Sequence, residues 1–152
     1  MKLEDQIRNI IEEECEDYFL GIVDLSHVKN DIIGQYDLFF DEYPLAISIG
    51  ITIPYMVTDD VLMASNVIYN ETNCKLKTIT VHLNSLLQDE GYKALSVPKA
   101  KMNDKTFISL HELAANLANL GEIKKNLVVT PEVGAGVNWG TILTNAPLEQ
   151  VK

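Results

Sequence analysis

The sequence predicts a single α/β domain in which helices pack around a small central sheet. The chain has 152 residues, 47% of them hydrophobic, which suffices for a substantial core but not for two ordinary domains. We therefore treat residues 1–152 as one domain. Several stretches repeat apolar residues at helical spacing, whereas residues 45–53 form an apolar run between two prolines. The presence of helical and strand-like patterns in one short chain favours a small mixed sheet flanked by helices.

The first predicted element is an amphipathic surface helix from Leu3 to Phe19. Its apolar residues recur at helical spacing, acidic residues fill most of the other positions, and Gly21 ends it. Residues 22–44 show no regular pattern, and we expect only a short helix near Asp31–Phe40.

The middle of the chain predicts a buried strand followed by a helix. Residues 45–53 are apolar on both sides of Gly50, which marks either the close approach of another backbone or a ligand, or a simple bulge. A helix is expected to start near residues 59–64, and residues 72–89 form a clear helix because their leucines share one face. Residues 94–97 are predicted to form a short strand.

The last third predicts a helix and two strands. The helix covers residues 105–120, and His111 falls on its apolar face, where it is either a hydrogen-bonded core residue or a ligand or acid–base group. Residues 126–130 and 139–144 are the strands. The glycines of the connecting segment, residues 131–137, suit either a turn or a loop whose backbone touches a ligand.

Charge and hydropathy exclude several classes of function. With 22 acidic and 12 basic residues the formal charge is −10, which repels nucleic-acid phosphates and anionic lipid. No apolar run reaches the length of a membrane span, and the N-terminus does not look like a secretory signal. We expect a cytoplasmic protein that binds neither nucleic acid nor membrane.

The sequence contains no complete catalytic or metal-binding motif. It lacks the phosphate-binding loop, the dinucleotide-binding fingerprint, the nucleophile elbow and the HExxH zinc motif. Cys15 and Cys74 lie far apart, which suits neither a disulfide framework nor a CxxC site. Two cysteines also cannot supply the four thiolates of a usual iron–sulfur cluster, so we expect none in this chain.

The C-terminal third nevertheless resembles a known family. An alanine-rich helix that contains His111 runs into Gly121-Glu-Ile-Lys-Lys-Asn126, and Trp139-Gly-Thr-Ile-Leu-Thr-Asn-Ala-Pro-Leu148 follows. These segments resemble the epoxyqueuosine reductase-like iron–sulfur proteins, where such a helix leads into GLGWIGK and later LTDAPL segments. The matching positions are His111, Gly121, Lys125, Asn126, Pro131, Gly134, Gly140, Thr141, Leu143, Thr144, Pro147 and Leu148.

The resemblance implies a domain related to the N-terminal, corrinoid-binding part of epoxyqueuosine reductases and reductive dehalogenases, with a nitroreductase-like fold. In complete members a ferredoxin-like domain with two four-iron clusters follows and delivers electrons to cobalt. No cysteine follows Cys74 here. We therefore expect cobalamin as cofactor and a separate ferredoxin-like protein as electron donor. Nitroreductases are usually dimers, which together with the aromatic-rich residues 36–43 predicts a homodimer.

Carried over by position, the resemblance also implies a cofactor site at one end of the sheet, where the 121–126 turn and the 134–136 loop are expected to meet. The family's catalytic acid position holds Lys105 here, and the neighbouring Asp104 is the candidate acid. The implied cofactor-binding residues are Gly121, Lys125, Asn126, Gly134, Gly140 and Thr144.

Besides Lys105, the chain departs from the family pattern at four positions of the glycine-rich turn and the LTDAPL segment. Asn119 and Lys124 replace glycines that give the turn its freedom, Glu122 replaces a tryptophan, and Asn145 replaces the aspartate of LTDAPL. Three functions stay open: a corrinoid-binding domain that is not a complete reductase alone, a non-catalytic interaction or structural subunit, and a flavin-dependent reductase. Whether the chain is an enzyme is open as well.

Overall fold

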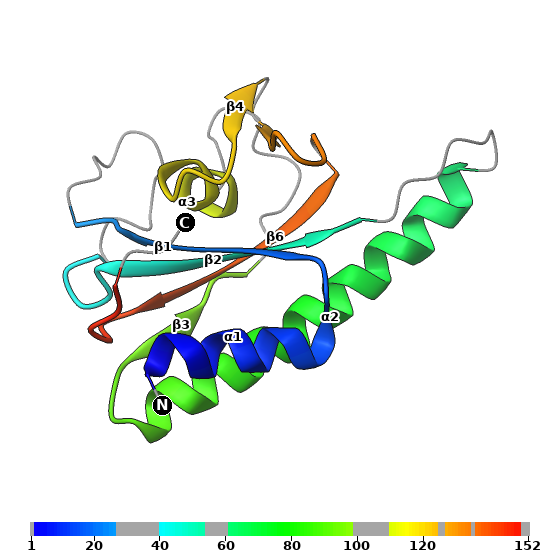
Figure 1. Ribbon diagram of the computed structural model, residues 1–152. Coiled ribbons are helices and arrows are strands. Elements are labelled where there is room, and N and C mark those ends of the chain that lie inside the picture. Colours follow the sequence, from blue (N-terminus) through cyan, green and yellow to red (C-terminus); the bar gives the residue numbers. More distant parts are fainter. Residues whose placement is uncertain are drawn as a thin grey trace.

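A computed structural model describes residues 2–26, 40–53, 61–98, 110–124, 127–134 and 136–149 of the chain. These residues form helices and strands in mixed order, which confirms the α/β class (Figure 1). In chain order the elements are α1 (Leu3–Glu14), β1 (Tyr18–Asp24), β2 (Leu45–Thr52), α2 (Val61–Asp89), β3 (Ala94–Ser96), α3 (Leu110–Leu117), β4 (Glu122–Lys124), β5 (Leu127–Val129) and β6 (Val137–Thr144).

The central sheet has four strands in the order β1-β2-β6-β3. Each of its pairings is antiparallel, so the mixed sheet that the sequence predicts is corrected to an antiparallel one. The longest ladder joins β2 and β6, from Leu45 opposite Thr144 to Thr52 opposite Val137. All eight residues of β6 are buried, because β6 lies inside the sheet and helices cover both of its faces.

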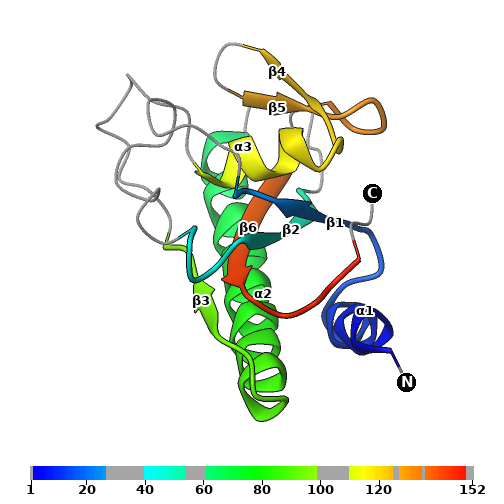
Figure 2. The ribbon, with the colours of Figure 1, turned by 90° about the vertical axis from the view of Figure 1, so that its left-hand side faces the viewer.

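The helices divide between the two faces of the sheet. Helices α1 and α2 lie on one face and α3 lies on the other (Figures 1 and 2). Side chains alternate along β2, so Ile47, Ile49 and Ile51 enter the core beneath α1 and α2, whereas Ala46 packs with α3. Burying all three isoleucines fixes the register of β2, because a shift by one residue would turn them towards α3.

The N-terminal helix is shorter than its apolar spacing predicts. Helix α1 ends at Glu14, where Cys15 turns to extended backbone at φ −155°, and Tyr18 already begins β1. Residues 18–23 are apolar on both sides, and pairing with β2 buries Leu20 and Ile22 against the core of α1 and α2. Tertiary pairing thus overrides a helical period that continues by coincidence to Phe19.

The strand predicted at residues 126–130 does not join the central sheet. Its described part, β5, pairs instead with β4, a short strand that the sequence analysis did not predict. The two helical segments predicted at 59–64 and 72–89 belong to one helix, α2. The expected helix near Asp31–Phe40 lies outside the described residues, apart from its last residue, Phe40, which is buried.

Within the described residues, no helix combines the length and the apolar character needed to cross a bilayer.

Candidate functional site

His111, on α3, occupies a buried polar position between α3 and the sheet. It is 5% exposed, and its Nε2 lies 3.0 Å from the carbonyl oxygen of Pro98 while its Nδ1 lies 2.9 Å from Oγ1 of Thr141. A carbonyl only accepts hydrogen bonds, so Nε2 carries the proton, and in a neutral ring Nδ1 then accepts from the Thr141 hydroxyl. The structure therefore shows His111 as a hydrogen-bonded core residue that joins α3 to β6.

A cavity of about 310 Å³ opens beside this histidine, between α2, the end of β3 and β6. We call it the α2–β6 pocket. Helix α2 contributes polar side chains three and four residues apart, and the rest of the wall is mainly apolar. Its lining residues are Asn73, Leu76, Lys77, Thr80, Val97, Pro98, His111, Gly140 and Thr141.

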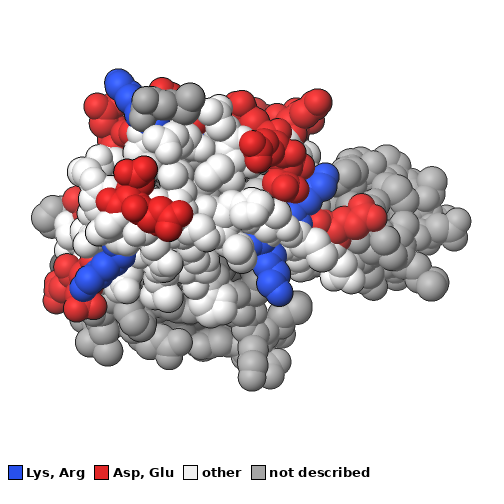
Figure 3. Space-filling model, turned by 90° about the horizontal axis from the view of Figure 1, so that it is seen from below, with Lys and Arg blue, Asp and Glu red and all other residues white. Residues whose placement is uncertain are grey.

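A second hollow, of about 610 Å³, lies where α1 ends beside α2. Its wall includes Glu12, Glu13, Glu14, Glu16 and Asp17, whereas Lys75 is its only basic residue. Acidic groups also lie spread over the face seen in Figure 3, with uncharged surface between them. The described residues contain no group of three or more histidine, cysteine or acidic residues placed to hold a metal ion.

Two of the predicted cofactor residues, Gly121 and Gly134, lie beside the end of β5. A Cβ atom on Gly121 would lie 2.7 Å from the carbonyl oxygen of Val129, so glycine is needed there for packing. Gly134 has φ +65° and exchanges backbone hydrogen bonds with Thr130, with open space where a side chain would be. The turn and the glycine loop thus contact consecutive residues, Val129 at the end of β5 and Thr130 directly after it, although a cofactor role for these glycines stays a prediction.

The other two described cofactor candidates lie in β6. Gly140 faces α2, where a Cβ atom would come within 3.1 Å of Leu76, and Gly140 also lines the α2–β6 pocket. Thr144 is fully buried, four residues further along the strand, and its hydroxyl donates a 2.6 Å hydrogen bond to the carbonyl of Lys93. The structure does not bring Gly140 and Thr144 together with Gly121.

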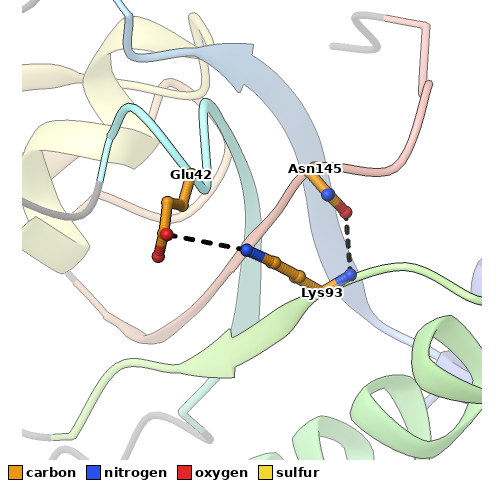
Figure 4. Close-up of polar contacts among 3 residues, drawn as sticks. All are labelled: Glu42, Lys93 and Asn145. Atoms are coloured by element: carbon orange, nitrogen blue, oxygen red, sulfur yellow. Dashed lines mark hydrogen bonds and ion pairs between the residues drawn. The ribbon is translucent and has the colours of Figure 1, made fainter.

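Asn145, directly after β6, is hydrogen-bonded to Lys93, directly before β3 (Figure 4). Oδ1 of Asn145 accepts a 2.8 Å hydrogen bond from the backbone N–H of Lys93, and Nζ of Lys93 lies 3.6 Å from Glu42. An aspartate at this position would offer the same acceptor oxygen. The replacement of the family's aspartate by Asn145 therefore preserves this contact, which holds the end of β6 against β3.

A second departure from the family pattern is also explained by backbone geometry. Asn119, which replaces a glycine after α3, has φ +65° and is the only described non-glycine residue with positive φ. Asparagine adopts this left-handed conformation more readily than most residues. The N–H of Leu120 then bonds the carbonyl of Ala115 at 3.0 Å, and Asn116 Nδ2 donates to Gly121 O at 2.9 Å. The turn thus keeps a glycine-like backbone at Asn119.

Three candidate site residues, Asp104, Lys125 and Asn126, lie outside the described residues, as does Lys105. The sequence analysis in turn missed Asn73, Lys77 and Thr80 of the α2–β6 pocket. These residues are four and three positions apart on one helix, and no acidic residue lies between them. This spacing could have indicated a shared polar face, but a solvent-exposed helix face has the same pattern.

Solved structures show where this fold occurs. The epoxyqueuosine reductase from Streptococcus thermophilus matches 100% of this chain with a TM-score of 0.63 and 17% identity, over 48% of its own length. An epoxyqueuosine reductase with an epoxyqueuosine-modified tRNA-Tyr stem loop matches 98% of the chain with a TM-score of 0.62 and 14% identity, over 47% of its length. No protein-family model and no curated protein sequence matches the chain.

Reductive dehalogenases share the fold as well. A catabolic enzyme of this kind, in complex with 3-bromo-4-hydroxybenzoic acid, matches 96% of the chain with a TM-score of 0.68 and 17% identity, over 21% of its length. Another, whose structure suggests a mechanism for B12-dependent dehalogenation, matches 99% with a TM-score of 0.60 and 12% identity, over 24% of its length. The chain thus has a fold common to epoxyqueuosine reductases and reductive dehalogenases, and spans less than half of each protein.

Proposed function

We propose that this chain is a corrinoid-binding domain that takes part in reduction only together with a separate, ferredoxin-like electron donor. The observation that carries the proposal is the match of almost the whole chain to reductases of two kinds, one of them described as acting in B12-dependent dehalogenation. The chain holds two cysteines, fewer than one iron–sulfur cluster takes, so a cluster that supplies electrons would have to lie outside these 152 residues.

The described residues by themselves do not fit an enclosed corrinoid. The two cavities described above measure about 310 and 610 Å³, and even cavities of roughly 300–1,000 Å³ enclose only drug-sized ligands, which are smaller than cobalamin. The larger of the two is also strongly acidic. Of the four described candidate residues, Thr144 is fully buried and Gly121 is packed against β5.

A titration with hydroxocobalamin tests the proposal directly. We expect a saturable change in the visible spectrum of the corrinoid, and Lys125→Glu should weaken binding by about 1–3 kcal/mol, the range for losing a charged hydrogen-bond partner. Lys124→Glu is the matched control, because Lys124 is exposed and lies 4.0 Å from Glu122. No saturable change would reject corrinoid binding, and equal weakening by both variants would point to net charge instead of a site at Lys125.

A non-catalytic interaction subunit is the second candidate, and one observation favours it. Two of the positions that carry the resemblance have structural roles: Gly121 packs against β5, and Thr144 donates a hydrogen bond to the carbonyl of Lys93. Such positions would persist in a protein that kept the fold and lost the ligand. Failure to bind hydroxocobalamin or flavin mononucleotide, with unchanged thermal stability in their presence, would support this candidate.

A further inference from the structure

The α2–β6 pocket differs in charge from the other cavities formed by described residues. The hollow beside α1 contains five acids from the segment 12–17 together with Glu71, and a third cavity, of about 440 Å³, is lined by Asn70, Glu71, Cys74 and Lys75. By contrast, the described residues in the wall of the α2–β6 pocket include Lys77 and no acidic residue. The described wall of this pocket therefore carries a positive charge, although the whole chain has a formal charge of −10.

Lys77 has no acidic neighbour on its own helix. The residues three and four positions away are Asn73, Cys74, Thr80 and Val81, none of them acidic. The ion pairs found among the described residues are Lys93 with Glu42 and Lys124 with Glu122. Within the described part of the chain, the ammonium group of Lys77 thus has no acidic partner, and the described wall offers no carboxylate that would compete with a bound anion.

Asn73 supplies a second donor on the same wall. Its Oδ1 accepts a 2.7 Å hydrogen bond from Nδ2 of Asn138, which is 2% exposed and also donates to Thr72 Oγ1 at 2.9 Å. Because Asn138 fixes the oxygen of the Asn73 amide, the NH₂ group of Asn73 is the end left to interact with a ligand. One turn separates Asn73 from Lys77, so both donors lie on the same side of α2.

The remainder of the pocket is apolar. Leu76, Val97 and Pro98 contribute carbon surface, and Gly140 leaves the strand backbone of β6 without a side chain at the wall. His111 and Thr141 are engaged with each other at 2.9 Å. A volume of about 310 Å³ is at the lower end of the range for small-molecule sites. From these features we propose that the α2–β6 pocket binds a small organic carboxylate with a short apolar body. The pocket includes Gly140, which is also one of the predicted cofactor residues, whereas Lys77 and Asn73, which carry this proposal, are not among them.

The carboxylate would accept hydrogen bonds from Lys77 and Asn73, while its apolar body contacts Leu76 and Pro98. Titration of the ¹⁵N-labelled protein with hexanoate, followed by amide NMR shifts, tests this without any corrinoid present. We expect saturable shifts that include Gly140 and Thr141, with a Kd of about 1 mM or tighter. Hexan-1-ol, which has the same apolar chain without the charge, should bind about tenfold more weakly.

Two variants separate the site from nonspecific charge effects. Lys77→Ala should weaken hexanoate binding about tenfold, whereas Lys75→Ala, which removes a neighbouring lysine outside the pocket, should leave it unchanged. Asn73→Asp keeps the acceptor for Asn138 but replaces the donor by a negative charge, and should weaken binding at least as much. Absence of saturable shifts, equal effects of both lysine variants, or undiminished binding to Asn73→Asp would each overturn the proposal, whatever the result with hydroxocobalamin.

Discussion

Three aligned residues on neighbouring strands form an aromatic contact across the central sheet. Phe19 lies opposite Gly50, which in turn lies opposite Trp139. The two rings meet over the glycine with centroids 5.7 Å apart and planes at 47°. A Cβ atom on Gly50 would lie 2.5 Å from a ring carbon of Trp139. The sequence suggested a bulge or the close approach of another backbone or a ligand at Gly50, whereas the structure shows regular pairing on both sides and the close approach of an indole side chain.

We expect Gly50→Ala to lower the free energy of unfolding by about 1–3 kcal/mol, because the added methyl group must displace the Trp139 ring. Urea denaturation measures the effect, and the emission of the single tryptophan should change with it. Ser48→Ala is the control in the same strand. Ser48 Oγ is fully buried and has no hydrogen-bond partner among the described residues, so its removal should leave stability equal or raise it by up to about 1 kcal/mol. A Gly50→Ala protein as stable as the wild type would contradict the packing argument.

At the scale of secondary structure elements, hydrogen bonds to the backbone of Lys93 join the end of β6 to the start of β3. Thr144 Oγ1 donates to the Lys93 carbonyl, Asn145 Oδ1 accepts from the Lys93 N–H, and the N–H of Ala146 donates to Thr144 Oγ1 at 3.1 Å. Both backbone groups of Lys93 are thus satisfied by side chains of two consecutive residues, Thr144 at the end of β6 and Asn145 directly after it. The ion pair of Lys93 with Glu42 is exposed and adds little.

Asn145→Asp should therefore be tolerated, with a change in unfolding free energy below about 0.5 kcal/mol, because the acceptor oxygen is retained. Asn145→Leu should cost about 0.5–1.5 kcal/mol, the net contribution of an ordinary hydrogen bond, since it leaves the exposed Lys93 N–H without this acceptor. Chemical denaturation of the three proteins in parallel gives the comparison. Equal stability of the leucine and aspartate variants would show that the hydrogen bond contributes nothing.

A second contact between distant elements predicts a pH dependence. The N–H of Glu149 donates a 2.9 Å hydrogen bond to Oε2 of Glu4, in the first turn of α1. This hydrogen bond is the main cause of a lowered pKa of Glu4, with smaller contributions from its own backbone and from Lys2. A carboxylate with a lowered pKa in the folded state stabilises the fold above its unfolded pKa, near 4.5, and loses this effect as the pH falls through the folded value.

Glu4→Gln should thus reduce stability by less than about 1 kcal/mol at neutral pH, because the contact is near the surface. The difference from the wild type should shrink as the pH falls below about 4.5. Thermal unfolding between pH 3 and pH 7 measures it, with Glu13→Gln on the same helix as a control for the change in charge. A difference between wild type and Glu4→Gln that stays constant down to pH 3 would contradict the assignment to Glu4.

The elements also show what the sequence could predict. Strands β2 and β6 and the second half of α2 have long, strongly apolar patterns, and each was predicted near its observed position. Strand β4 has three exposed residues and β1 follows α1 without a helix-breaking residue, so neither has a local signal. The pairing of β6 with β2 and β3 connects residues far apart in the chain, which periodicity alone does not determine.

The candidate site was harder to predict for a related reason. Glycine patterns pointed to Gly121 and Gly134, and the structure places both beside β5, whereas Gly140 and Thr144 owe their positions to packing against α2 and β3. A resemblance in sequence does not show whether a matching residue binds a ligand or only packs within the fold. The polar wall of the α2–β6 pocket is formed by residues that become neighbours of β6 and His111 only through tertiary folding.

For the whole molecule, we expect purified protein to contain no iron–sulfur cluster. Its two cysteines differ in surroundings: Cys15 follows α1 and donates to the carbonyl of Asp17 at 3.1 Å, whereas Cys74 is exposed on α2. Four thiolates usually hold a cluster, so one chain cannot supply a full ligand set. Anaerobic purification followed by iron and acid-labile sulfide analysis provides the measurement. About four of each per chain would contradict the expectation.

Two copies of the chain could in principle pool four cysteines, so light scattering must accompany the analysis. The homodimer proposed from the resemblance should have about twice the 17.0 kDa chain mass and still contain no iron. Dimers with about two iron and two sulfide per chain would instead show a cluster shared between copies, which would overturn both this prediction and the need for a separate electron donor. As a control, Cys74→Ser should leave both the mass and the iron content unchanged, because an exposed thiol on α2 makes no contribution to a cluster that is absent.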